Sequence, residues 1–150
     1  MKIVVISDTH GDLSALRRVA LIENDADVYL HAGDVEASSG DISPFAAVKG
    51  NCDGAFPEFP FRYETMTPFG KLHMEHYPIY SSAMISALKQ QGVRIFIHGH
   101  THEREEELVD GVWVFCPGSL PFPHDSDAGT YLVLDISEKE VKSTFKTIVV

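Results

Sequence analysis

Short apolar runs, several of them ending at a glycine or a carboxylate, dominate the hydrophobic pattern of this chain. Residues 2–7 read KIVVIS, a β-branched run typical of a strand that is buried on both faces. A helical pattern follows, and Asp12 is placed to cap it. Residues 27–32 and 45–49 predict two further buried strands. The chain therefore begins in the manner of a βαβ unit.

From residue 61 onward the pattern predicts mostly strands. A helix capped by Ser81 or Ser82 and ending at Gly92 interrupts them. Turns are predicted between Pro68 and Gly70 and at Asp110-Gly111. The predicted strands are 61–66, 71–76, 94–98, 105–109, 112–116, 130–136 and 141–149. The pattern thus predicts an α/β fold, a layered αββα sandwich of two mixed sheets flanked by helices, in a single domain spanning residues 1–150.

Composition supports a well-formed core in one domain, because 44% of the 150 residues are hydrophobic and only 23% are charged. The two cysteines, Cys52 and Cys116, are too few for a disulfide framework and have no Cys-x-x-Cys spacing. The apolar run near the N-terminus is interrupted by Asp8, too early for a signal peptide or a membrane span. We therefore expect a cytoplasmic protein without a membrane partner.

The formal net charge of −10, without any cluster of Lys or Arg, argues against a partner that is a long nucleic acid. A nuclease that grips long strands is disfavoured for the same reason. Two bound dications would change the sum to −6, the result of −10 + 4, and would favour a small anion at the site. The sequence leaves the oligomeric state open.

Five short motifs, each following an apolar run, carry side chains that bind metal ions. Carboxylates and imidazoles are costly to bury without partners, so their recurrence at strand ends indicates a shared cation. Residues two apart on a strand point to the same side, and a carboxylate such as that of Asp34 can bridge two cations. Asn51 offers a carbonyl oxygen, although Gly50-Asn51 is also good turn chemistry. The motifs are Asp8-Thr9-His10, Gly33-Asp34, Gly50-Asn51-Cys52-Asp53, His76 and Gly99-His100-Thr101-His102.

In this order the motifs resemble those of the calcineurin-like metallophosphoesterases, and the short chain with Gly-Asn-Cys-Asp resembles the small prokaryotic phosphodiesterase branch. The resemblance implies a binuclear site that hydrolyses a small phosphoester, more readily a diester than a monoester, by in-line attack of a metal-bridging hydroxide. Catalytic roles are implied for Asn51, Asp53 and His76. The implied ligands are Asp8, His10, Asp34 and His102 for one ion and Asp34, Asn51, His76 and His100 for the other. The family suggests two Mn²⁺ ions, and the mixed oxygen and imidazole set also suits Fe²⁺, Co²⁺, Ni²⁺ or Zn²⁺.

Two positions depart from the family's usual pattern. Cys52 stands where many relatives have a histidine that protonates the leaving group, and a thiol is a poorer general acid. We therefore expect a preference for good leaving groups, as in aryl diesters; equal turnover of alkyl leaving groups would contradict this. Tyr77 follows His76 where glycine is usual, so its ring either narrows the site or turns outward. His73 is a rival ligand to His76, but it has the opposite strand parity.

The remaining histidines and a second function stay open. His31 and His98 are expected to support neighbouring ligands or to lie in the core, and His124 is either a contact for a substrate phosphate or a surface residue. A retromer subunit resembles this fold and serves as a protein-interaction scaffold with an incomplete metal site. The alternative function is therefore a scaffold that binds metal with little catalysis. Because every ligand position is filled here, the sequence favours the enzyme.

Overall fold

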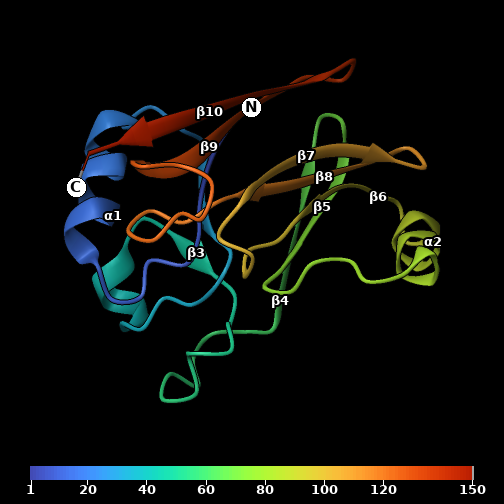
Figure 1. Ribbon diagram of the computed structural model, residues 1–150. Coiled ribbons are helices and arrows are strands. Elements are labelled where there is room, and N and C mark those ends of the chain that lie inside the picture. The colour runs from blue at the N-terminus through green and yellow to red at the C-terminus, as the bar shows by residue number, and fades with distance from the viewer. Residues whose placement is uncertain (150) are drawn as a thin grey trace.

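The computed structural model describes residues 1–149 and arranges them in four layers, in the order helix, sheet, sheet, helix (Figure 1). The first sheet has the strand order β10-β9-β1-β2-β3. Strands β1, β2 and β3 are parallel, and β9 and β10 are antiparallel to their neighbours. The bounds are β1 (Lys2–Ile6), β2 (Val28–His31), β3 (Ala46–Ala47), β9 (Gly129–Ile136) and β10 (Val141–Ile148).

The second sheet has the order β4-β5-β6-β8-β7, with β5, β6 and β8 parallel at its centre. Two hairpins, β4-β5 and β7-β8, contribute the antiparallel pairs. The β7-β8 turn is the predicted Asp110-Gly111 pair, and both residues have the positive φ that a two-residue hairpin requires. The bounds are β4 (Arg62–Thr67), β5 (Gly70–Glu75), β6 (Val93–Ile97), β7 (Arg104–Val109) and β8 (Val112–Pro117).

One helix covers the outer face of each sheet (Figure 1). Helix α1 (Leu13–Ile22) begins at Asp12, whose side chain accepts a hydrogen bond from the Ala15 amide at 3.1 Å. Helix α2 (Ser82–Gln90) is capped by Ser81, which accepts from the Met84 amide at 3.3 Å. Both predicted caps and the predicted αββα sandwich are therefore confirmed. Neither helix within residues 1–149 is long and apolar enough to cross a membrane.

Strand β1 explains why an uninterrupted apolar run is needed at the centre of such a sandwich. Successive side chains of a strand point to opposite faces. Val4 and Ile6 pack with the buried face of α1, whereas Ile3 and Val5 pack between the two sheets. Each such side chain contributes roughly 1.5–3 kcal/mol when fully buried. A third apolar cluster lies between α2 and the second sheet. The core thus has three layers, one for each interface between elements.

The structure differs from the sequence prediction in the segment before the third motif. The predicted strand 45–49 is only the two-residue β3, because β2 ends at His31 and offers only Leu30 and His31 as partners. A 3₁₀ helix (Ser39–Ile42) that the pattern did not predict precedes it. The short β3 frees the chain to turn toward the ends of β1 and β2.

Candidate metal centre

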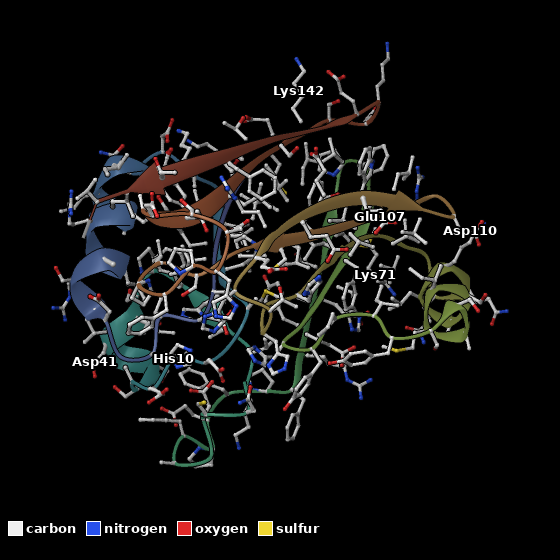
Figure 2. All side chains as sticks on the ribbon, in the orientation of Figure 1. His10, Asp41, Lys71, Glu107, Asp110 and Lys142 are labelled. Carbon is white, nitrogen blue, oxygen red and sulfur yellow. The ribbon has the colours of Figure 1, made fainter. Side chains whose placement is uncertain are left out.

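All seven predicted metal ligands lie in loops that directly follow parallel strands of the two sheets. Three loops come from the first sheet and two from the second, and hydrogen bonds join them. The His100 amide donates to Asp8 Oδ2 at 3.1 Å, and His76 Nδ1 donates to the Ala32 carbonyl at 2.7 Å. Figure 2 labels His10, to the lower left of the centre of the view.

Left-handed backbone is concentrated in these loops. Among residues 1–149, every non-glycine residue with positive φ except Asp110 is a predicted ligand or Glu36. Such conformations cost free energy and gather at functional sites. They also correct the expectation that strand alternation would align Asp8 with His10, because β1 already ends at Ile6. The residues are Asp8, His10, Asp34, Glu36, His100 and His102, with φ between 46° and 73°.

The first predicted ligand set comes together around one buried carboxylate oxygen. Asp8 Oδ1 lies 3.4 Å from His102 Nε2, and His102 Nε2 lies 3.3 Å from His10 Nε2. His10 Nε2 is 3.9 Å from Asp34 Oδ2. When several donor atoms bind one ion with bonds of about 2.0–2.2 Å, the donors lie about as far from one another as these atoms do. These four side chains are therefore spaced to hold one cation.

The second predicted set shares the same oxygen of Asp34. Asp34 Oδ2 lies 3.4 Å from His76 Nε2, which is 3.0 Å from Asn51 Oδ1. His100 Nδ1 is 3.2 Å from that Asn51 oxygen. The other oxygen, Asp34 Oδ1, accepts from the Cys52 amide at 2.8 Å, which fixes the carboxylate. Asp34 Oδ2 thus faces both sets of donors.

The Nδ1 atoms of three ligand histidines make hydrogen bonds that direct the lone pairs of their Nε2 atoms toward the centre. Nδ1 of His10 donates to Glu36 Oε1 at 2.6 Å, and Nδ1 of His102 donates to the Phe122 carbonyl at 2.8 Å. Nδ1 of His76 likewise donates to the Ala32 carbonyl. Each ring therefore turns an unprotonated Nε2 inward when it is neutral, as metal-binding histidines do. Asp8 Oδ1 is buried and, within residues 1–149, has no hydrogen-bond partner. The residues present fit divalent cations.

Charges around the centre agree with this fit. Burial raises the pKa of Asp34, but the contact with His76 and the Cys52 amide outweigh it and hold the pKa at about 2. The contact with Asp8 raises the pKa of His102. Burial lowers the pKa of His76, yet Asp34 and Asp8 bring it above its ordinary value. The carboxylates thus attract positive charge to the positions that the imidazole lone pairs face.

Asp53 lies beside the centre but points away from it. Its fully buried carboxylate accepts four backbone hydrogen bonds at 2.8–3.2 Å, which tie the Asp34 loop to the Gly50 turn. A Cβ at Gly50 would collide with Asp34, so glycine is required where the two loops touch. The donors are the amides of Asp34, Val35, Glu36 and Gly50. The geometry suits Asp53 for holding these loops together.

Sequence reasoning missed the Ala32 carbonyl, which orients His76, and two further groups that orient ligands. Glu36 bonds His10, and the Phe122 carbonyl bonds His102. The two-residue spacing between Asp34 and Glu36 could have signalled the first. No local signal could have found the second, because Phe122 lies 20 residues from His102 in the sequence. Such partners fix the ring orientation of a metal-binding histidine.

The other histidines lie outside the ligand cluster. His73 bonds Glu64 and Glu75 on the α2 side of the second sheet and does not reach the centre. His98 is buried between Glu105 and the Gly99 carbonyl, directly behind the His100 loop. His124 is exposed, and its ring centroid lies 4.8 Å from that of His102.

The two departures from the family pattern are both at the edge of the centre. Cys52 is exposed, and burial together with the charges of Asp34 and Glu36 raises the pKa of its thiol. The Tyr77 ring lies against the predicted ligands His76 and His100, with centroids 5.2 and 5.0 Å away. It therefore does not turn outward.

His31 supplies a pH prediction for stability. The ring is fully buried, Nδ1 accepts from the Gly33 amide at 3.1 Å, and Nε2 bonds Thr9 Oγ1 at 2.8 Å. Burial lowers its pKa from 6.5 to about 4. Because the unfolded chain binds this proton first, the free energy of unfolding should fall by about 3 kcal/mol as the pH drops from 6.5 to 4.

Urea unfolding of the metal-free protein across this pH range measures the effect. We expect His31→Gln to flatten the pH dependence, because glutamine does not titrate. His124→Gln, at an exposed histidine, is the control. An unchanged slope in His31→Gln would contradict the assignment.

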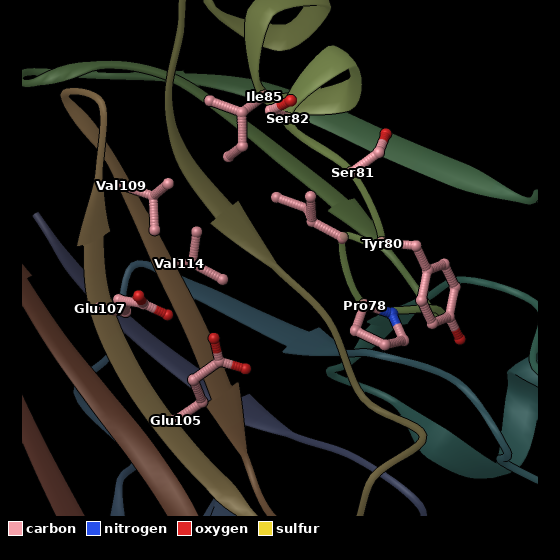
Figure 3. A pocket seen from close by; sticks show the side chains of 10 residues that line it. Pro78, Tyr80, Ser81, Ser82, Ile85, Glu105, Glu107, Val109 and Val114 are labelled. Carbon is pink, nitrogen blue, oxygen red and sulfur yellow. The ribbon is translucent and has the colours of Figure 1, made fainter.

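A cavity of about 360 Å³ lies on the other side of the second sheet from the centre (Figure 3). It lies between the segment that precedes α2 and the strand pair β7-β8, with Tyr80, Glu105, Glu107 and Val114 in its wall. None of the predicted ligands lines it. The metal centre is therefore separate from this cavity.

An αββα sandwich with carboxylate and imidazole donors at its strand ends defines the class of metallophosphoesterases. Residues 1–139 match the calcineurin-like phosphoesterase superfamily domain. The chain belongs to this superfamily, whose members use divalent metals.

Individual relatives agree with this membership. Phosphodiesterase YfcE of Escherichia coli K12 is 25% identical over 163 residues, covering 90% of this chain and 88% of that protein. A conserved uncharacterized protein of Streptococcus pneumoniae TIGR4, described as a predicted phosphoesterase, has a TM-score of 0.85 and 26% identity, covering 97% of this chain and 88% of that one. Vps29 of Entamoeba histolytica, solved in complex with Zn²⁺, has a TM-score of 0.72 and 19% identity, covering 98% and 99%, and shares the fold.

Proposed function

We propose that this protein is a binuclear metal-dependent phosphodiesterase that acts on a small phosphoester. The observation that carries the proposal is the convergence of Asp8 Oδ1, Asp34 Oδ2 and three inward-facing Nε2 atoms, with Asp8 Oδ1 buried and unpaired within residues 1–149. Relatives named as phosphodiesterases support the reaction class. Mn²⁺ remains our proposal for the ion, on the family resemblance.

The proposed roles follow from the contacts of each side chain. Asp8, His10, Asp34 and His102 would hold one ion, and Asp34, Asn51, His76 and His100 the other. When bound, the ions supply charge neutralisation for the phosphoryl oxygens and a water of lowered pKa. Glu36, the Phe122 carbonyl and the Ala32 carbonyl keep three imidazoles in the required tautomer. Asp53 keeps the Asp34 and Gly50 loops in register, so we assign it a positioning role.

The centre also favours a diester over a monoester. Within residues 1–149, no Lys or Arg makes a hydrogen bond or ion pair to any of the seven proposed ligands. The ligands therefore bring no bonded Lys or Arg with them to neutralise the second charge of a monoester. The chain's formal net charge of −10 adds repulsion toward more highly charged substrates.

The scaffold alternative has support in the fold likeness to Vps29, which says nothing of activity in this chain. Both proposed ligand sets are complete here, and their rings are oriented by hydrogen bonds that a docking surface does not need. We therefore prefer the enzyme.

The test is hydrolysis of bis(p-nitrophenyl) phosphate and p-nitrophenyl phosphate by metal-stripped protein, with each divalent ion added back separately. We expect turnover only with metal, and faster for the diester. Metal binding without hydrolysis of either ester would favour the scaffold.

A further inference from the structure

The Tyr77 ring is an exposed aromatic surface at one edge of the metal centre. It is 43% exposed although it contacts His76 edge-on and His100 at a tilt. Two proposed ligands of the second ion thus cover one part of the ring, and the rest faces solvent. A tyrosine serving only the core would be covered more completely.

Phe122 forms a corresponding surface beside the first ligand set. Its ring is 58% exposed and lies 6.0 Å from that of His10. The backbone of Phe122 is fixed at both ends: its amide donates to Ser119 Oγ at 3.1 Å, and its carbonyl accepts from His102 at 2.8 Å. Ser119 in turn donates to the Asp8 carbonyl at 2.8 Å. The exposed ring is therefore held in place by residues of the centre itself.

We propose that Tyr77 and Phe122 are the aromatic walls of the substrate site, and that the substrates are phosphodiesters whose esterified groups carry planar aromatic rings, as nucleosides and aryl alcohols do. The inference rests on the proposed phosphodiesterase function and names its substrate class. Rings that stack on these walls add affinity for the esterified groups, beyond the attraction of the ions for the phosphate, and no Lys or Arg within residues 1–149 is bonded to the proposed ligands. Stacking is sequence-tolerant and suits small aromatic groups of several kinds.

Two diesters with the same leaving group test the walls. Bis(p-nitrophenyl) phosphate and methyl p-nitrophenyl phosphate both release p-nitrophenolate, and they differ only in whether the retained group is a ring. With kcat/KM corrected for the intrinsic reactivity of each ester, we expect the wild type to prefer the aryl ester. Tyr77→Leu and Phe122→Leu should each lower kcat/KM for the aryl ester about threefold to tenfold, chiefly through KM. The methyl ester keeps one ring, its leaving group, so it should be spared only in the variant whose wall faces the retained group.

Matched controls are available at other exposed rings of the chain. Tyr80→Leu changes a tyrosine that is 70% exposed in the same segment, and Phe61→Leu changes a phenylalanine that is 71% exposed. Neither ring contacts a proposed ligand, so neither change should alter the preference. A loss of preference in the controls equal to that in Tyr77→Leu and Phe122→Leu would overturn the proposal.

A binding measurement separates this inference from the proposed activity. Calorimetry of the metal-loaded protein with diphenylphosphinate and dimethylphosphinate, which have no ester bond to hydrolyse, gives the ring preference directly. A preference that weakens in Tyr77→Leu and Phe122→Leu supports the walls even if wild type hydrolyses no ester, in which case the proposed function alone fails. Equal affinity for the two phosphinates overturns the inference. Equal kinetic losses for the aryl and methyl esters in both variants do so too, because the two rings would then only support the ligands.

Discussion

Replacing Asp34 by Asn should abolish metal-dependent hydrolysis while the chain still folds. Asp34 Oδ2 is the atom that faces both ligand sets, and the carboxylate is ionised because its pKa is held at about 2. Asparagine removes the charge but can still accept the Cys52 amide hydrogen bond through its oxygen. A metal ion contributes several kcal/mol to phosphoryl transfer, so turnover should fall by at least about two orders of magnitude.

Metal content and thermal unfolding test the same change without relying on activity. Binding to the folded state raises Tm, and this rise should shrink in Asp34→Asn together with the number of bound ions per chain. The metal-free variant should still fold but be somewhat less stable than the metal-free wild type, because the lowered pKa of Asp34 means that the fold stabilises its ionised carboxylate. Asp135→Asn makes the same chemical change at an exposed carboxylate of β9, paired with Lys2 at the end of β1 remote from Asp8. Undiminished turnover in Asp34→Asn would contradict the proposed bridge.

Local chemistry explains what the sequence predicted well. The run of residues 3–6 had to be apolar because β1 has a layer of core on each face, and Asp12 and Ser81 cap helices through contacts three residues away. The proposed ligands could be named because each follows such a strand. Signals of this kind span only a few residues, which a single sequence contains.

Long-range contacts explain what the sequence could not predict. The left-handed backbone at Asp8 and His10 is stabilised by hydrogen bonds from their amides to the carbonyls of Gly33 and Asp34, in the loop that follows β2. The direction of the Tyr77 ring depends on where the His100 loop packs. The pattern also overextended the third strand, because only the end of β2 determines where β3 stops. Each of these features depends on a partner that local pattern does not specify.

Replacing Asp53 by Asn should destabilise the protein and reduce turnover together. The carboxylate accepts four backbone amides with its two oxygens, three on Oδ2 and one on Oδ1. Asparagine has one acceptor oxygen, so its NH₂ group must face at least one amide donor in a fully buried place. Charge-assisted hydrogen bonds are worth about 1.5–3 kcal/mol, and an unsatisfied buried donor costs about 1–3 kcal/mol. We expect the free energy of unfolding to fall by about 3 kcal/mol.

A loss of both stability and turnover in Asp53→Asn distinguishes a positioning role for Asp53 from a direct catalytic one. If Asp53 touched the substrate, Asp53→Asn would lower kcat and leave stability nearly unchanged. If it holds the Asp34 and Gly50 loops, unfolding free energy and metal affinity should both fall, and excess metal should restore part of the turnover. Asp12→Asn is the matched control, because aspartate and asparagine are equivalent N-caps and the Ala15 amide keeps its acceptor. If Asp53→Asn kept full stability and metal affinity but lost turnover, Asp53 would have a catalytic role. The four amide donors around its carboxylate lead us to expect the opposite.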